Sequence, residues 1–281
     1  DRQADSSAEP MVILRDELVD AWKGQDVFSL MENMQGKVAR EMKDRQTLRF
    51  EINGQGYYRK WHRGVGWQEI IKNCIRLRWP VLGASNEWNA LNKLRALGIP
   101  SLIPLAYGVR GKNPARQQSF IVTRELTDVI QLDHFFERCS VGIKAKHRIL
   151  KSIATIAREL HAAGINHRDF YLCHFMLKAN FIADQEQIPE IYLVDLHRAQ
   201  LRPRVPQRWL VKDLGGLLFS SLNMNFTRRD YLRFMREYFG CSVREVLATR
   251  SEMLKQVQQK AIKMYWRDFG HAPNFDLQKV F

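Results

Sequence analysis

The sequence of 281 residues predicts an α+β fold with two unequal lobes. The front of the chain combines a strand hairpin with one strong amphipathic helix, and the back half shows long helical periodicities. An apolar fraction of 45% is typical of a globular protein, and a chain of this length can bury a core without disulfides. This order of elements favours a small strand-rich lobe, a larger helical lobe and a cleft between them.

We expect residues 1–10 to form a polar tail, residues 11–126 the first lobe and residues 127–281 the second. The two lobes together would make one domain. The longest nearly apolar run, residues 214–222, is about half the ~20 residues that a membrane-spanning helix needs. The sequence therefore predicts no transmembrane segment.

Strand patterns dominate the front of the chain. Residues 45–52 and 57–61 flank an Asn-Gly turn, which is a strong hairpin signal. Alternation places Leu48, Phe50 and Ile52 on one face of the first of these strands. Residues 119–126 predict a further strand.

Three segments show helical spacing. Residues 86–97 carry an apolar face and end at Gly98, and a second helix ends at Gly164 after apolar residues spaced by three or four. Residues 69–80 mix apolar and basic side chains, which fits either a helix packed on the core or one lying on an anionic membrane surface. The apolar residues of the second helix are Ile149, Ile153, Ile156 and Leu160.

The chain carries 44 Lys and Arg against 30 Asp and Glu, a formal net charge of +14. Such an excess favours a polyanionic partner, and the alternative is a basic surface that has no specific partner. Because there is no zinc-finger spacing, no RNP aromatic motif and no heptad repeat, we expect no nucleic-acid partner. The four cysteines are scattered and form no CxxC pair, which indicates reduced thiols.

Two aspartates follow apolar stretches in the second lobe. Asp169 ends a His-Arg-Asp triplet, and Asp195 follows 26 residues later. Two carboxylates so placed suit phosphoryl transfer, since one can accept the proton of an attacking hydroxyl and the other can hold magnesium against nucleotide phosphates. In the first lobe, Lys60 on a strand and Glu87 at the start of a helix match the lysine–glutamate pair of kinase-type sites.

Seven stretches carry a family resemblance that covers nearly everything after Met11. The chain resembles the WaaP/RfaP family of lipopolysaccharide core heptose kinases, within the protein-kinase-like superfamily. Among these stretches, His174 in its setting and the run Asp-Leu-His-Arg-Ala from Asp195 are long and unusual. The stretches are residues 57–64, 80–84, 86–88, 161–169, 171–175, 194–200 and 208–213.

The resemblance implies ATP- and Mg²⁺-dependent phosphorylation of a heptose, heptose I, in the inner core of lipopolysaccharide. It also implies a peripheral position at the cytoplasmic face of the inner membrane of a Gram-negative bacterium. The expected partners are the lipopolysaccharide acceptor and the anionic membrane surface. An acidic protein such as an acyl carrier protein would also suit the charge.

The resemblance assigns roles to five residues. Lys60 would contact nucleotide phosphates and Glu87 would orient it. Asp169 would be the catalytic base and Asp195 the metal ligand, whereas Asp213 would brace the His-Arg-Asp backbone as a structural residue.

The sequence departs from the wider kinase pattern at three places. Gly36 stands alone where a glycine-rich loop would have three glycines. His174 replaces the asparagine that usually ligates a second metal, so it is assigned to nucleotide phosphate, to metal or to bracing the loop. His197 replaces the glycine of the Asp-Phe-Gly motif.

A basic run without any Asp or Glu follows Asp195 and extends to Lys212. It lies where kinases bind their substrates, and arginines suit the carboxylates and phosphates of lipopolysaccharide. The alternative is a solvated basic loop. The arginines assigned to substrate are Arg198, Arg202, Arg204 and Arg208.

The sequence is also compatible with other functions. The core motifs handle ATP and not the acceptor, so a Kdo sugar, a small molecule or a protein could replace the heptose. A non-catalytic basic scaffold at the membrane surface is the alternative from another class. Against it, Lys60, Glu87, Asp169 and Asp195 all carry competent side chains.

Overall fold

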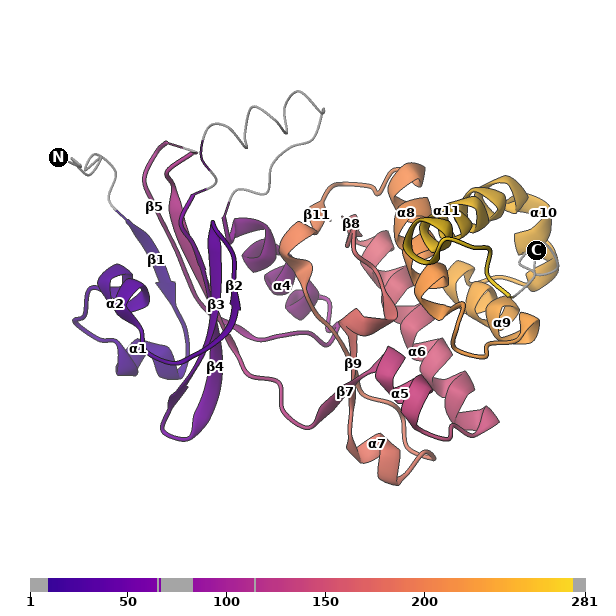
Figure 1. Cartoon of the computed structure of the whole chain (residues 1–281), viewed down its shortest axis with the longest axis horizontal. Helices are drawn as coiled ribbons and strands as arrows, with labels where there is room; N and C mark the ends of the chain where they lie inside the picture. Colours follow the sequence, from indigo (N-terminus) through magenta and orange to yellow (C-terminus); the bar gives the residue numbers. More distant parts are fainter. Residues whose placement is uncertain (1–9, 65, 67–82, 114, 275–281) are drawn as a thin grey trace. The chain divides into compact units, whose positions relative to one another are not determined.

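The computed structural model describes residues 10–64, 66, 83–113 and 115–274, and it divides into two compact units (Figure 1). Unit 1 contains the chain up to Ala96 together with Leu102–Leu126 and Leu196–Arg198. Unit 2 contains Leu97–Ser101, Thr127–Asp195 and the chain from Ala199 onward. Residues 1–9 of the expected tail and the whole stretch 69–80 lie outside the described residues.

Unit 1 is built on a six-stranded sheet in the order β1-β5-β6-β4-β3-β2, and every neighbouring pair is antiparallel. The predicted hairpin is confirmed: Asn53 and Gly54 both have positive φ, at 50° and 79°, as a two-residue turn requires. The strands are β1 (Met11–Leu14), β2 (Lys37–Glu41), β3 (Arg45–Ile52), β4 (Gln55–His62), β5 (Pro104–Arg110) and β6 (Gln118–Arg124).

Helices cover both faces of this sheet (Figure 1). α1 (Glu17–Ala21) and α2 (Val27–Asn33) pack on one face, where Leu48 and Phe50 are buried as their alternation predicts. α4 (Ser85–Ala96) packs against the other face, and its Trp88 stacks on a tyrosine of β5. Because successive side chains of a strand point to opposite faces, β4 presents Lys60 to the α4 side.

Unit 2 is mainly helical, as the periodicities predict. The apolar stripe from Ile149 to Leu160 is buried along α6, and Gly164 ends the helix with φ at 80°. A side chain at Gly164 would meet the carbonyl oxygen of Arg202 at 1.7 Å, so this position requires glycine. The helices are α5 (Leu132–Arg138), α6 (Ile143–Ala162), α7 (Asn180–Ala183), α8 (Gln207–Ser221), α9 (Arg228–Phe239), α10 (Val243–Thr249) and α11 (Ser251–Phe269).

Short strands hold the loops of unit 2 in place. One sheet has the order β10-β9-β7 and another pairs β11 with β8. A 3-10 helix, η1 (Leu172–His174), leads into the first sheet, and η2 (Leu196–Arg198) belongs to unit 1. The strands are β7 (Val129–Gln131), β8 (Ile165–Asn166), β9 (Phe175–Lys178), β10 (Ile191–Leu193) and β11 (Gln200–Leu201). Within the described ranges, no helix is long and apolar enough to cross a membrane.

Candidate active site

In unit 1, Lys60 and Glu87 form an ion pair with 2.6 Å between Nζ and Oε1. The side chain of Glu87 is only 2% exposed and that of Lys60 is 18% exposed. Oε1 of Glu87 accepts from the lysine, and Oε2 is buried without a hydrogen-bond partner among the described residues. The ammonium group is therefore held at a fixed place on the α4 side of the sheet.

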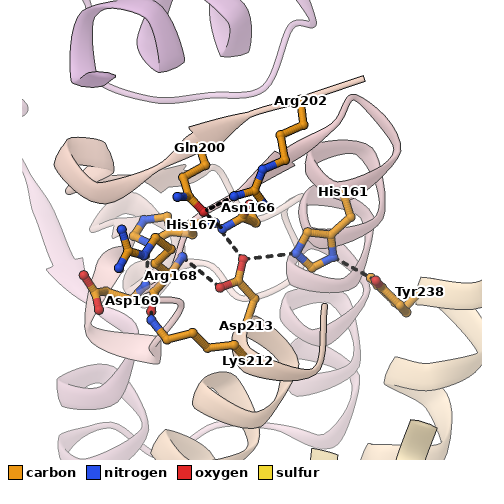
Figure 2. Close-up of polar contacts among 10 residues, drawn as sticks. All are labelled: His161, Asn166, His167, Arg168, Asp169, Gln200, Arg202, Lys212, Asp213 and Tyr238. Carbon is orange, nitrogen blue, oxygen red and sulfur yellow. Dashed lines mark hydrogen bonds and ion pairs between the residues drawn. The ribbon is translucent and has the colours of Figure 1, made fainter. Parts of the chain in front are cut away.

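In unit 2, the carboxylate of Asp213 holds the backbone of the His-Arg-Asp loop (Figure 2). The backbone N–H of His167 donates to Oδ2 at 2.6 Å, and that of Arg168 donates to Oδ1 at 2.8 Å. Asp213 lies in the first half of α8 and is fully buried. A buried carboxylate that accepts backbone N–H groups fixes the loop, because losing it would leave those donors unsatisfied.

His161 completes this support from α6. Its Nε2 lies 3.3 Å from Oδ2 of Asp213, and its Nδ1 lies 2.8 Å from the hydroxyl of Tyr238 (Figure 2). Since the carboxylate accepts, Nε2 carries the proton and the tyrosine donates to Nδ1. Burial raises the pKa of Tyr238, which keeps the hydroxyl protonated for this role. Three helices, α6, α8 and α9, therefore support one loop.

His167 links the loop to the chain that carries Asp195. Its Nε2 donates to the carbonyl of Val194 at 2.9 Å, and its Nδ1 accepts from the backbone N–H of Asp169 at 3.3 Å. Burial lowers the pKa of His167, so the ring is neutral, as one donor and one acceptor require.

His174 joins the two candidate aspartates. Its Nδ1 donates to the backbone carbonyl of Asp169 at 2.6 Å, and its Nε2 lies 3.5 Å from Oδ2 of Asp195. The ring also stacks on His167 with 5.6 Å between centroids. Asp169, His174 and Asp195 therefore lie together in unit 2, and His174 braces the loop.

Two non-glycine residues of this region adopt left-handed backbone. Arg168 has φ at 75° and Asp195 has φ at 63°. Such conformations cost of order 1–3 kcal/mol and persist where the surrounding contacts hold them. Arg168 directly precedes Asp169, the candidate base, and Asp195 is itself the candidate metal ligand.

The basic run is divided by the structure. Arg198 lies in η2 within unit 1, whereas the other arginines belong to unit 2. Arg202 donates to Asn166 at 3.1 Å and to Gln200 at 2.7 Å, so it supports the pairing of β8 with β11 (Figure 2). Arg204 is exposed, and Arg208 lies against the ring of Trp209.

Comparisons with known proteins decide the family. Residues 30–238 match the model described as "Lipopolysaccharide kinase (Kdo/WaaP) family". The chain belongs to the lipopolysaccharide kinase (Kdo/WaaP) family.

Curated relatives of this kinase family match nearly the whole chain. A lipopolysaccharide core heptose(I) kinase WaaP from Escherichia coli is 45% identical over 90% of this chain and 97% of its own length. Its counterpart from Pseudomonas aeruginosa is 42% identical over 91% and 96%. A solved structure, WaaP in complex with acyl carrier protein, is 38% identical, has a TM-score of 0.79 and matches 91% of this chain and 99% of its own. These matches confirm the predicted family and the kinase-like α+β fold.

The donor set of this lipopolysaccharide kinase fits a magnesium ion. Across the described part of the chain, no three His, Cys, Asp or Glu side chains are grouped as a closed metal cage. Mg²⁺ in phosphotransferases uses one or two carboxylates and completes its shell with water and substrate phosphates. Asp195, whose side chain is 32% exposed, offers such a carboxylate.

Several residues of the kinase site were not identified from sequence. His161, Tyr238 and Asn166 support the loop, but none of them was assigned a role from the sequence, although His161 and Asn166 lie within the family-like stretch 161–169. The position of His161 after Leu160 on the buried stripe of α6 was a further signal. Gly36 is explained by packing, since a side chain there would lie 2.2 Å from the carbonyl oxygen of Arg49.

Proposed function

We propose that this chain transfers the γ-phosphoryl group of ATP to a hydroxyl of heptose I in the inner core of lipopolysaccharide. The observation that carries the proposal is its identity of 42–45%, over about 90% of its length, with three curated heptose(I) kinases. The candidate residues supply the functions that such a transfer needs.

Asp169 is the proposed base, because its carboxylate can accept the proton of the attacking hydroxyl. Asp195 is the proposed magnesium ligand, and Mg²⁺, when bound, would neutralise charge on the nucleotide phosphates. His174 holds the Asp169 backbone and faces the Asp195 carboxylate, so we assign it to positioning rather than to direct phosphate binding.

Lys60 is proposed to contact the nucleotide phosphates and Glu87 to orient its ammonium group, as their 2.6 Å ion pair allows. Asp213 has no contact with substrate in this scheme, since its oxygens accept from the loop backbone and His161. Arg198, Arg202, Arg204 and Arg208 are proposed as the basic run that meets anionic groups of the acceptor.

We place the protein at the cytoplasmic face of the inner membrane, where its anionic acceptor would be made. The net charge of +14 suits that surface, and it also suits an acidic protein partner. Since a similar protein is solved with acyl carrier protein, we propose that this chain binds an acyl carrier protein too. Co-elution of the two purified proteins at low salt, lost at high salt, tests this partner.

The transfer itself is tested with purified protein, ATP, Mg²⁺ and core lipopolysaccharide that lacks heptose phosphate. Mass spectrometry of the cleaved core is expected to place one new phosphate on heptose I. The Asp169→Asn variant, mixed with the same reagents, is the matched control. Phosphate on the Kdo sugar, on an added protein or on no acceptor at all contradicts the proposed acceptor.

A further inference from the structure

We propose that four cations gathered around Trp209 form a site for an oxyanion of the acceptor, a carboxylate or a phosphate, beside the catalytic loop. This inference rests on the proposed function. It assigns the binding of the acceptor's anionic group to the part of the basic run that surrounds Trp209. The charged groups lie 5.2, 5.4, 5.5 and 5.7 Å from the centroid of the indole ring. They belong to Arg168, Arg202, Arg208 and Lys212, which with Trp209 we call the Trp209 cluster.

Arg202 and Arg208 repel one another, so their closeness is costly unless an anion lies between them. Arg202 donates to the neutral oxygens of Asn166 and Gln200, which leave its charge uncompensated. Within the described part of the chain, no carboxylate forms an ion pair with Arg202 or Arg208. Burial, and then the charge of Arg208, lower the pKa of Arg202. A bound anion would relieve this repulsion.

The first turn of α8 adds to the positive potential. Trp209 and Arg208 lie in this turn, which contains no acidic residue, and the N-cap Pro206 provides no capping side chain. The helix dipole favours an anion at such an end. The indole Nε1–H of Trp209 is also buried without a hydrogen-bond partner among the described residues, and a ligand oxygen would satisfy it.

The Trp209 cluster adjoins the proposed base. Arg168 directly precedes Asp169 in the chain, and Nζ of Lys212 donates to the carbonyl oxygen of Arg168 (Figure 2). The neighbouring acid, Asp213, already accepts from the loop backbone and from His161. An oxyanion held by the cluster would therefore fix the acceptor next to Asp169.

Arginine and tryptophan have different tasks in this site. A guanidinium offers parallel N–H donors that match the two oxygens of a carboxylate or phosphate. The indole attracts the cations to its faces by cation–π contacts and so keeps them close together. Arg208, which is exposed, is the binding residue that a substitution can test most cleanly, whereas Trp209 positions the cations and offers its N–H to the ligand.

The first test is a split between the two Michaelis constants. Arg208→Gln and Trp209→Leu are expected to raise the acceptor KM about tenfold, with kcat and the KM for ATP within about twofold of wild type. Trp209→Phe keeps an aromatic face for the cations but removes the indole N–H, so it is expected to recover part of the loss. Arg244→Gln removes one exposed charge from α10 and is the matched control. An unchanged acceptor KM in folded Arg208→Gln and Trp209→Leu overturns the proposal, as does an equal rise in the KM for ATP.

Altered acceptors distinguish the two sources of the oxyanion. If the anion is a phosphate, wild type and Arg208→Gln should have the same KM for acceptor stripped of its lipid phosphates. If it is a carboxylate, the two should become equal for acceptor whose sugar carboxylates have been reduced. A difference that persists with both altered acceptors contradicts the site.

A binding measurement separates this inference from the proposed function. Inorganic phosphate is added to the full chain with ADP and Mg²⁺ present, and its ³¹P line width is recorded at low salt. Wild type and Arg244→Gln should broaden the line severalfold more than Arg208→Gln and Trp209→Leu do. This result would stand even if no phosphate were transferred to lipopolysaccharide. Equal broadening in all four proteins overturns the inference whatever the acceptor is.

Discussion

Two buried acids in the two units have opposite kinds of partner. Glu87 in unit 1 accepts from one side chain, that of Lys60, and keeps Oε2 without a partner among the described residues. Asp213 in unit 2 accepts from two backbone N–H groups and from His161. The first arrangement holds a charged group that can act on a ligand, and the second fixes a loop. Both acids are buried, so the difference between their roles comes from the groups that donate hydrogen bonds to them.

A large effect is expected at Asp195, which belongs to neither the Lys60–Glu87 pair nor the Asp213 hydrogen bonds. Asp195→Ala should lower kcat/KM about a thousandfold and weaken Mg²⁺-dependent nucleotide binding, because the carboxylate proposed to hold the ion is gone. Titration with a fluorescent ATP analogue, with and without Mg²⁺, measures this. Unchanged Mg²⁺-dependent affinity would remove Asp195 from the metal site.

Removing the hydrogen bonds of Asp213 should lower the stability of the fold. Asp213→Asn keeps the shape but sets an amide against a backbone donor, and we expect a loss of about 3 kcal/mol in the free energy of unfolding. Urea denaturation measures it. Because backbone N–H groups cannot be mutated away, no second substitution at His161 should restore stability; recovery in such a double variant would show that the histidine was the main partner.

The Lys60–Glu87 arrangement should behave in the opposite way. Lys60→Met is expected to lower kcat/KM for ATP about 10- to 100-fold and also to destabilise unit 1, since it leaves a buried carboxylate unpaired. In Lys60→Met/Glu87→Gln the carboxylate is gone, so thermal stability should return while activity does not. Melting temperature and steady-state kinetics on the same preparations separate the two effects. Joint recovery of both would make the pair purely structural.

The smallest expected effect concerns His62, close to Lys60 on β4. Burial, with the nearby charges of Arg45 and Lys60, lowers the pKa of His62 to about 3 from 6.5. The unfolded chain therefore binds a proton below pH 6.5 that the folded chain does not, so stability falls as pH decreases. His62→Leu should reduce the loss of stability between pH 7 and pH 5.5 by on the order of 1 kcal/mol.

The exposed His271 provides the control for this pH effect. His271→Asn should leave the pH dependence of the melting temperature as it is in wild type. If His62→Leu and wild type lose stability in parallel as the pH falls, His62 does not remain neutral in the folded protein.

Local patterns predicted the elements that local chemistry determines. The alternation of Leu48 and Phe50, the stripe from Ile149 to Leu160 and the helix-ending Gly164 are all confirmed, since periodicity and glycine backbone freedom act over a few residues. β1 was missed because four residues carry little signal and its partner, β5, is about ninety residues away.

The resemblance named the candidate site residues, whereas most of their contacts could not be read from the sequence. The resemblance assigned Asp213 to the loop backbone, but the sequence did not show that Arg202 bonds to Asn166 or that cations gather around Trp209. Arg59 shows the same limit: it is 1% exposed on the core face of β4 and donates to the carbonyl of Met31, although most arginines on a strand would be expected at the surface.

The most direct test of the account is single-turnover phosphoryl transfer by Asp169→Asn, with Mg²⁺–ATP affinity measured on the same protein. If Asp169 is the base that accepts the proton of the acceptor hydroxyl, the transfer rate should fall about 10²- to 10⁴-fold. The affinity for Mg²⁺–ATP should stay within about twofold of wild type, since the side chain acts on the hydroxyl and not on the nucleotide. A transfer rate within a few-fold of wild type, in a variant that still binds nucleotide, would contradict the account.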